Sequence, residues 1–164
     1  MGRFRFSFAA IVVALAFNSS GVFAQAASQS ACDPAPARAT SVQGTVEVRR
    51  VGDTQWRALN LNDALCPGDQ IRVQERSRAD IQLLDQSVLR LNANSTITVE
   101  APKERTTGVV DLVRGAVHFF SRGPRSLEVK TPYTIAGVRG TEFFIDVDTQ
   151  RAQMIVYEGT VVAD

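Results

Sequence analysis

The most constraining feature of this sequence is an alternation of apolar and polar residues that runs from Val42 to the end of the chain. Val46 and Val48 alternate with polar neighbours, and the same period of two recurs at residues 79–83 and 143–147. Successive side chains of a β-strand point to opposite faces, so this period is typical of half-buried strands. No segment after Val42 sustains the 3.6-residue stripe of an amphipathic helix. The sequence therefore predicts an all-β domain.

Turn signals separate these strands at short intervals, which favours a sandwich, a barrel or a solenoid. A weak internal similarity places a glycine and a small residue at four expected strand entrances: Gly44, Gly115, Gly140 and Gly159. Their spacing is uneven, so they do not form a regular repeat array. We expect a twisted, β-solenoid-like domain, with a β-sandwich as the alternative.

The stretch from Lys130 to Phe144 organises the second half of the chain. Pro132 fixes φ and lacks a backbone donor, so the strand before it is expected to stop at Lys130. Gly137 and Gly140 are points where the backbone can take a positive φ or approach a neighbouring strand closely. Thr141 then leads into a strand in which Phe143, Ile145 and Val147 share one face. We interpret this stretch, together with Gly159, as a packing motif.

Several segments together resemble the FecR domain, named for the ferric citrate regulator of Gram-negative bacteria. The segments that carry the resemblance are GTVEVRR from Gly44, LCPGDQIRV from Leu65, RADIQLLDQSVLRLNANSTITV from Arg78, LVRGAVHFF from Leu112, TPYTIAGVRGTEFFIDV from Thr131 and IVYEGTV from Ile155. They follow one another in order over residues 42–164, which is specific for the domain.

The resemblance implies a non-enzymatic periplasmic module that binds an envelope protein or relays a signal. In the regulator itself, the domain is the periplasmic part of an anti-sigma regulator of iron uptake. Because no cytoplasmic anti-sigma segment precedes the apolar run in this sequence, we do not expect the chain itself to control a sigma factor. A role as a scaffold is therefore favoured over a role as a regulator. Carbohydrate or peptidoglycan binding is the alternative from a different functional class.

Residues 1–24 have the pattern of a secretory signal peptide. Arg3 and Arg5 precede an apolar run over residues 6–17, and Val22-Phe23-Ala24 places small residues before a predicted cleavage at Gln25. The alternative is an uncleaved anchor, but about a dozen apolar residues are short for a bilayer that needs about 20. We therefore expect a periplasmic protein without stable membrane insertion.

Residues 25–41 are expected to form an unstructured leader, and residues 42–164 a single domain. Export makes Cys32 and Cys66 a candidate disulfide that would tie this leader to the domain; two unrelated thiols are the alternative. The sequence from Glu158 to Asp164 has the pattern of a turn and the start of another strand. We therefore expect either a short last strand or a longer protein of which this is the front part.

Charge and composition exclude several functional classes. Removal of Arg3 and Arg5 lowers the number of basic residues from 18 to 16, against 17 acidic residues. A net charge near −1 gives no electrostatic basis for nucleic-acid binding. The sequence contains no phosphate-binding loop, no HExxH motif and no cluster of cysteine and histidine. We predict no catalytic, cofactor or metal site.

His118 is the only histidine, and the alternation places it on the outward face of a strand, where we expect it to be solvated. Without it, neither a serine nor a cysteine nucleophile has a base.

The remaining candidates lie on the surface. Arg76, Arg78 and Arg90 fall on outward or turn positions and form a candidate partner surface, although charges on strands often serve only solubility. Phe120 and Phe144 are also outward; we expect another rung to cover them, and exposure to a partner is the alternative. Three other aromatic residues could stack on sugars, but they fall on separate segments: Trp56, Tyr133 and Tyr157.

Overall fold

The computed structural model describes residues 32–101, 107–121 and 126–163, and within these residues every regular element is a β-strand. The predicted signal peptide lies outside the described residues. The strands are β1 (Ala37–Gln43), β2 (Val46–Arg49), β3 (Arg57–Ala58), β4 (Ala64–Leu65), β5 (Gln70–Val73), β6 (Arg78–Leu83), β7 (Val88–Leu91), β8 (Thr96–Val99), β9 (Thr107–Phe120), β10 (Ser126–Lys130), β11 (Ile135–Val147) and β12 (Ala152–Ala163). The predicted all-β class is confirmed.

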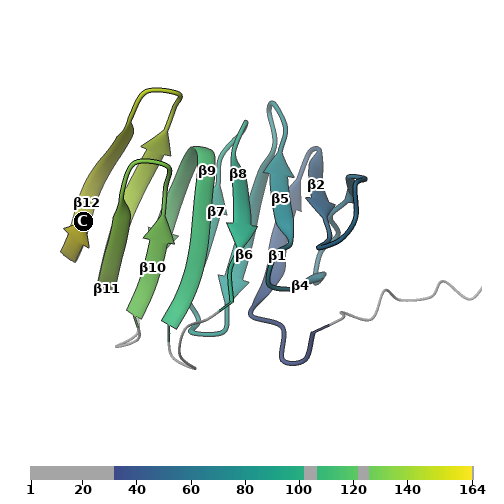
Figure 1. Cartoon of the computed structure of the whole chain (residues 1–164), viewed down its shortest axis with the longest axis horizontal. Coiled ribbons are helices and arrows are strands. Elements are labelled where there is room, and N and C mark those ends of the chain that lie inside the picture. Colours follow the sequence, from purple (N-terminus) through teal and green to yellow (C-terminus); the bar gives the residue numbers. More distant parts are fainter. Residues whose placement is uncertain (1–31, 102–106, 122–125, 164) are drawn as a thin grey trace, which may run out of the picture.

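All twelve strands belong to one hydrogen-bonded sheet. They lie side by side along the long axis of the domain, with β12 at one end and β2 and β4 toward the other (Figure 1). The path runs β3-β2-β5-β8-β9-β7-β6-β1-β4, and β10, β11 and β12 continue the sheet beyond β9.

The long strand β9 connects the two parts of this sheet. Its first half pairs with β8 and β10, and its second half pairs with β7 and β11. Gly115 stands between the halves with φ of 88°. A Cβ atom there would lie 2.5 Å from the Cα atom of Ser95, so the close approach of the two backbones requires glycine. The sequence pattern predicts two short strands here, one with Val110 and Leu112 and one with Val117 and Phe119, separated at Gly115; the structure instead has one strand that continues through this glycine.

The four glycines of the weak internal similarity all occupy corners of this kind. Gly44, Gly115, Gly140 and Gly159 all have positive φ, and each marks a corner at which the chain passes from one run of strand pairing to another. Gly140 lies inside β11, which already begins at Ile135, and does not end a turn before a strand as expected. Gly137 also differs from expectation, because its φ is not positive and the nearest atom to an added Cβ would be 3.9 Å away.

The core consists of the inward-facing residues of the alternating strands. Phe119 of β9 and Phe143 of β11 are fully buried, and their rings stack 4.6 Å apart with an interplanar angle of 3°. Ile145 and Val147 point inward beside Phe143, as the alternation predicts. The stacked pair of Phe119 and Phe143 contributes about 0.5–1.5 kcal/mol to stability beyond the apolar area that it buries.

The turn before β11 is held by Thr131. Its hydroxyl accepts hydrogen bonds from the backbone of Tyr133 and Thr134, at 3.2 and 3.0 Å. Pro132 lies inside this turn, and β10 ends at Lys130, immediately before it.

The start of the domain differs from the sequence expectation. The leader was expected to extend to residue 41, but β1 begins at Ala37 and pairs with β4 and β6. Ala37 and Ala39 are buried in the core, so their small size fits a tightly packed strand although it resembles a flexible leader in the sequence. A disulfide joins Cys32 to Cys66, with 5.7 Å between their Cα atoms, as predicted.

Candidate functional site

The outward face around β9, β11 and β12 carries the most unusual side chains of the domain. Register pairing places Arg90 of β7 beside His118 of β9, His118 beside Phe144 of β11, and Phe144 beside Ile155 of β12. Cross-strand neighbours on one face lie close enough for their side chains to interact. A continuous row of side chains therefore crosses four strands.

His118 is the centre of an aromatic cluster, which we define as His118, Phe120, Phe144 and Tyr157. The centroid of its ring lies 4.1 Å from that of Phe120, 5.4 Å from that of Tyr157 and 6.4 Å from that of Phe144. Phe120 and Phe144 are half-buried, and Tyr157 is 59% exposed. The expectation that another rung covers these two phenylalanines is wrong for the described residues. Their partial exposure gives the cluster an accessible apolar surface.

Tyr157 reaches this cluster because of a β-bulge that the sequence alternation does not reveal. From Glu142 to Phe143, β11 advances by one residue while β12 steps from Glu158 to Val156. Tyr157 is therefore the extra residue, and a bulge of this kind re-aims a side chain. In the sequence, Tyr157 falls on a separate segment from the other aromatic residues, so the alternation alone does not predict this contact.

His118 is not a freely solvated histidine, contrary to the sequence expectation. One-quarter of its side chain is exposed, and its Nε2 atom is buried without a well-aligned hydrogen bond. This atom lies 3.0 Å from Oε1 of Glu142, which places the two groups to form an ion pair when the imidazole is protonated. The site thus combines aromatic surface with at least one carboxylate.

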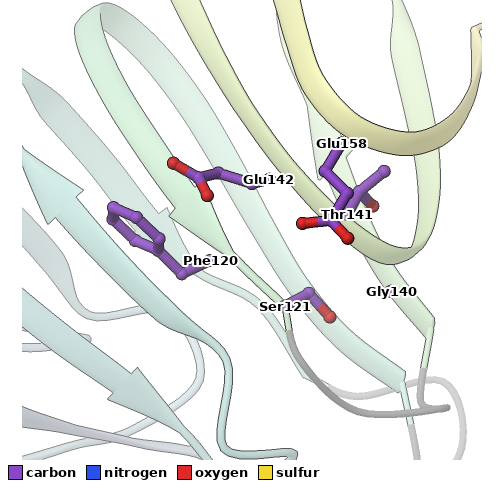
Figure 2. A pocket seen from close by; sticks show the side chains of 6 residues that line it. All are labelled: Phe120, Ser121, Gly140, Thr141, Glu142 and Glu158. Atoms are coloured by element: carbon purple, nitrogen blue, oxygen red, sulfur yellow. The ribbon is translucent and has the colours of Figure 1, made fainter.

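A hollow of about 350 Å³ opens beside the cluster, at the corners of β11 and β12. Figure 2 shows the residues that line it: Phe120, Ser121, Gly140, Thr141, Glu142 and Glu158. A Cβ atom on Gly159 would lie 2.4 Å from Cγ2 of Thr141 and 2.7 Å from the carbonyl oxygen of Gly140. The close approach of β12 to β11 that shapes this corner therefore requires glycine at position 159.

Two hydroxyl groups in this hollow have no hydrogen-bond partner among the described residues. Ser121 is 5% exposed and Thr141 is 2% exposed, and neither Oγ nor Oγ1 is bonded. The backbone N–H of Ser121 donates to the carbonyl of Thr141 at 3.0 Å, which holds the two residues together. A buried polar group without a partner is uncommon and costs free energy, so these two hydroxyls call for an explanation.

The outer edge of the sheet at this end is β12. This strand pairs only with β11, and its opposite edge meets no other strand among the described residues. The large apolar side chains that it leaves exposed are Ile155, Val156, Tyr157 and Val162. Exposed edges usually carry charges or prolines that prevent pairing with another chain, but within residues 152–163 the one charge is Glu158.

The predicted arginine surface is divided. Arg76 and Arg78 line a separate hollow with Gln43 and Asn92. Arg90 is not part of it: its guanidinium pairs with Asp80, Nε to Oδ1 at 3.1 Å, and lies 5.3 Å from the centroid of Phe120. Hydrogen bonding to Asp80 raises the pKa of Arg90. Arg90 therefore borders the aromatic cluster, while Arg76 and Arg78 lie elsewhere.

The other aromatic candidates are also apart from the cluster. The guanidinium groups of Arg72 and Arg49 lie over the ring of Trp56, at 4.3 and 5.1 Å from its centroid. The hydroxyl of Tyr133 donates to the carbonyl of Asp148 at 3.3 Å. Of the three residues considered for stacking on sugars, Tyr157 is the one with aromatic neighbours in the described structure.

Across residues 32–101, 107–121 and 126–163, no three histidine, cysteine or acidic side chains come together as metal ligands. No helix long and apolar enough to cross a membrane occurs there either.

The chain is similar to known proteins over its strand-rich part. Residues 69–162, or 94 of the 164 residues, match the model of a family described as FecR protein. A crystal structure described as a candidate anti-sigma factor from Parabacteroides distasonis aligns with a TM-score of 0.44 and 18% sequence identity. The alignment covers 57% of this chain and 49% of that chain, so it spans about half of that protein. No protein with a curated description matches.

Proposed function

Because the chain belongs to the FecR protein family, we propose that it is a non-catalytic module of the periplasm that binds a protein partner and relays a signal. The observation that carries this proposal is the open edge of β12. A segment of a partner can add to such an edge as a further strand, with main-chain hydrogen bonds providing affinity.

The side chains near this edge suit a protein partner. The aromatic cluster provides half-exposed apolar surface, and Arg90, Glu142 and Glu158 provide charges around it. Aromatic residues surrounded by polar ones are typical of the energetic centres of protein interfaces. The partner strand would gain main-chain pairing along β12 and side-chain contacts with the cluster.

Export to the periplasm is part of the proposal and rests on the sequence pattern of residues 1–24. Mass spectrometry of fractionated cells should find a mature protein that starts at Gln25 in the soluble periplasmic fraction. An intact N-terminal peptide in the membrane pellet would contradict export with cleavage.

We also infer a β-solenoid-like stack rather than two separate sheets. Support comes from the single hydrogen-bonded sheet and from Gly44, Gly115 and Gly140, at which the chain changes its strand partners.

Site-specific photocrosslinking tests the interaction. A photoreactive amino acid at Ile155 in β12 should capture a discrete protein in living cells. The matched control is the same residue at Arg57, in the exposed strand β3 at the other end of the sheet path. Equal capture from both positions, or no discrete product from Ile155, would contradict binding at the β12 edge.

Carbohydrate binding is the second candidate, because Tyr157 and Phe144 gather around His118 on one face. Sedimentation with purified peptidoglycan distinguishes the two functions. Binding that is lost in Tyr157→Ala would favour the carbohydrate, and absence of co-sedimentation would favour the protein partner.

A further inference from the structure

We infer that the hollow at the corners of β11 and β12 is a receptor for an organic cation, an ammonium or guanidinium group. Under the proposed function, on which this source of the cation rests, the group is a lysine or arginine side chain of the partner strand that adds to β12. The hollow lies directly beside that edge, since Glu158 belongs to β12 itself.

The carboxylates give the first argument. Glu142 and Glu158 are register partners on adjacent strands, and like charges in this relation destabilise a sheet. Glu142 has His118 within 3.0 Å, but Glu158 forms no ion pair with any described residue. A cation in the hollow would remove the repulsion and provide Glu158 with a partner.

The buried hydroxyls give the second, independent argument. Ser121 and Thr141 are more than nine-tenths buried and line the hollow, and no described residue forms a hydrogen bond with their Oγ and Oγ1 atoms. An ammonium group has three donors and a guanidinium group has five, and neither has an acceptor. Hydroxyl oxygens and a carboxylate provide the acceptors that such a donor-rich group needs.

Phe120 gives the third argument. It lines the hollow, and the guanidinium of Arg90 already lies over its ring at 5.3 Å. An aromatic face attracts cations through its quadrupole, so an aromatic wall beside a carboxylate favours an organic cation. Calcium, in contrast, requires six to eight oxygen ligands, which an aromatic wall does not provide. Figure 2 shows the two carboxylates directed differently, with that of Glu142 toward Phe120 and that of Glu158 toward Ser121.

Titration with small cations tests the site without knowledge of the partner. Ethylguanidinium chloride and butylammonium chloride are added to the purified protein, with sodium chloride at equal ionic strength as the reference. Saturable shifts of the amide NMR signals of Ser121, Thr141 and Glu158 are expected, and Glu158→Gln should weaken binding at least fivefold. Glu75→Gln, at an exposed glutamate outside the hollow, should bind like the wild type.

Two results would overturn the inference. One is a set of shifts that do not saturate or that persist unchanged in Glu158→Gln. The other is a calcium chloride titration that saturates the same amides and displaces the organic cations.

Thr141→Val separates a binding role from a structural one. Valine keeps the shape and removes a buried hydroxyl without a partner, so the melting temperature should stay equal or rise. Binding of ethylguanidinium should nevertheless weaken. Unchanged binding in Thr141→Val would remove the hydroxyl from the site.

Crosslinking from Ile155 distinguishes this inference from the proposed function. If Glu158→Gln weakens capture of the partner, both are supported. If capture is unchanged in Glu158→Gln, the partner binds but does not place its cation here, and the inference is wrong. If no partner is captured while the cations still bind, the proposed function fails and the hollow takes a free amine instead.

Discussion

At the scale of single residues, Asp69 shows how a buried charge can be structural. Only 1% of it is exposed, and its carboxylate accepts hydrogen bonds from the backbone of Cys66 and Val51 at 2.8 and 3.0 Å. Nη1 of Arg50 forms an ion pair with Oδ2 of Asp69 at 2.7 Å. In the sequence, Asp69 is the last residue of a Cys-Pro-Gly-Asp turn that already contains Cys66, but its partners Arg50 and Val51 come from positions that only the fold brings to it.

Asp69→Ala should lower the free energy of unfolding by about 3–5 kcal/mol, because it removes the carboxylate that neutralises Arg50 and leaves two backbone donors unbonded. Urea denaturation monitored by circular dichroism measures this. Asp53→Ala is the matched control, since Asp53 pairs with Arg57 at 3.4 Å on the surface and such pairs contribute little. Similar midpoints for the two variants would show that Asp69 is not a structural centre.

The surroundings of Asp111 predict that the stability of the fold depends on pH. Burial raises the pKa of its carboxyl, the nearby Glu100 raises it further, and Lys130 partly opposes both. A carboxyl whose pKa is higher in the folded than in the unfolded state favours folding at acidic pH, and this contribution is lost as the pH rises through the folded pKa.

Asp111→Asn should therefore stabilise the protein at neutral pH, and its advantage should disappear as the pH falls below the unfolded pKa. Melting temperatures at neutral pH and at about pH 3.5 would measure the difference. A destabilised variant at neutral pH would mean that the attraction between Asp111 and Lys130 outweighs burial.

At the scale of elements, β9, β11 and β12 owe their length to glycines that bend them without ending them. The period of two correctly indicated the strands and their inward residues, because it reflects burial of one face. It could not indicate that two neighbouring segments form one bent strand, since a corner and a turn both use glycine. The bulge at Tyr157 and the buried hydroxyls of the hollow depend on register between distant strands, which the sequence pattern does not encode.

Gly140→Val should lower the free energy of unfolding by about 1–3 kcal/mol, because a β-branched residue is strained at a φ of 60°. Gly137→Val, in the same strand, is the control and should be tolerated, since Gly137 has neither a positive φ nor a close neighbour. Arg90→Ala should cost less than about 1 kcal/mol, as is usual for an exposed ion pair. Equal urea midpoints for the two valine variants would show that the corner at Gly140 accepts any residue.

At the scale of the whole molecule, the two ends of the sheet are secured differently. At the β12 end the edge is open and apolar, which suits the capture of a partner. Toward the other end, β1 pairs with the two-residue strand β4, and the disulfide from Cys32 to Cys66 lies directly after β4. The edge of β12 is thus unpaired among the described residues, while β4 toward the other end lies next to a covalent link.

This difference predicts how the molecule responds to reduction. The disulfide joins residues 34 positions apart, and closing a loop of this length in the unfolded chain is worth about 3–4 kcal/mol in the chain-entropy model. Dithiothreitol should therefore lower the urea midpoint of the wild type but leave that of Cys32→Ser/Cys66→Ser unchanged.

In hydrogen exchange, the amides of β1 and β4 should lose more protection on reduction than those of β11, because β4 is short and relies on the disulfide. Photocrosslinking from Ile155 should survive reduction in conditions where the protein stays folded. Loss of protection first in β11 and β12 would show that the disulfide stabilises the β12 end as well, and the two ends would then not be independent.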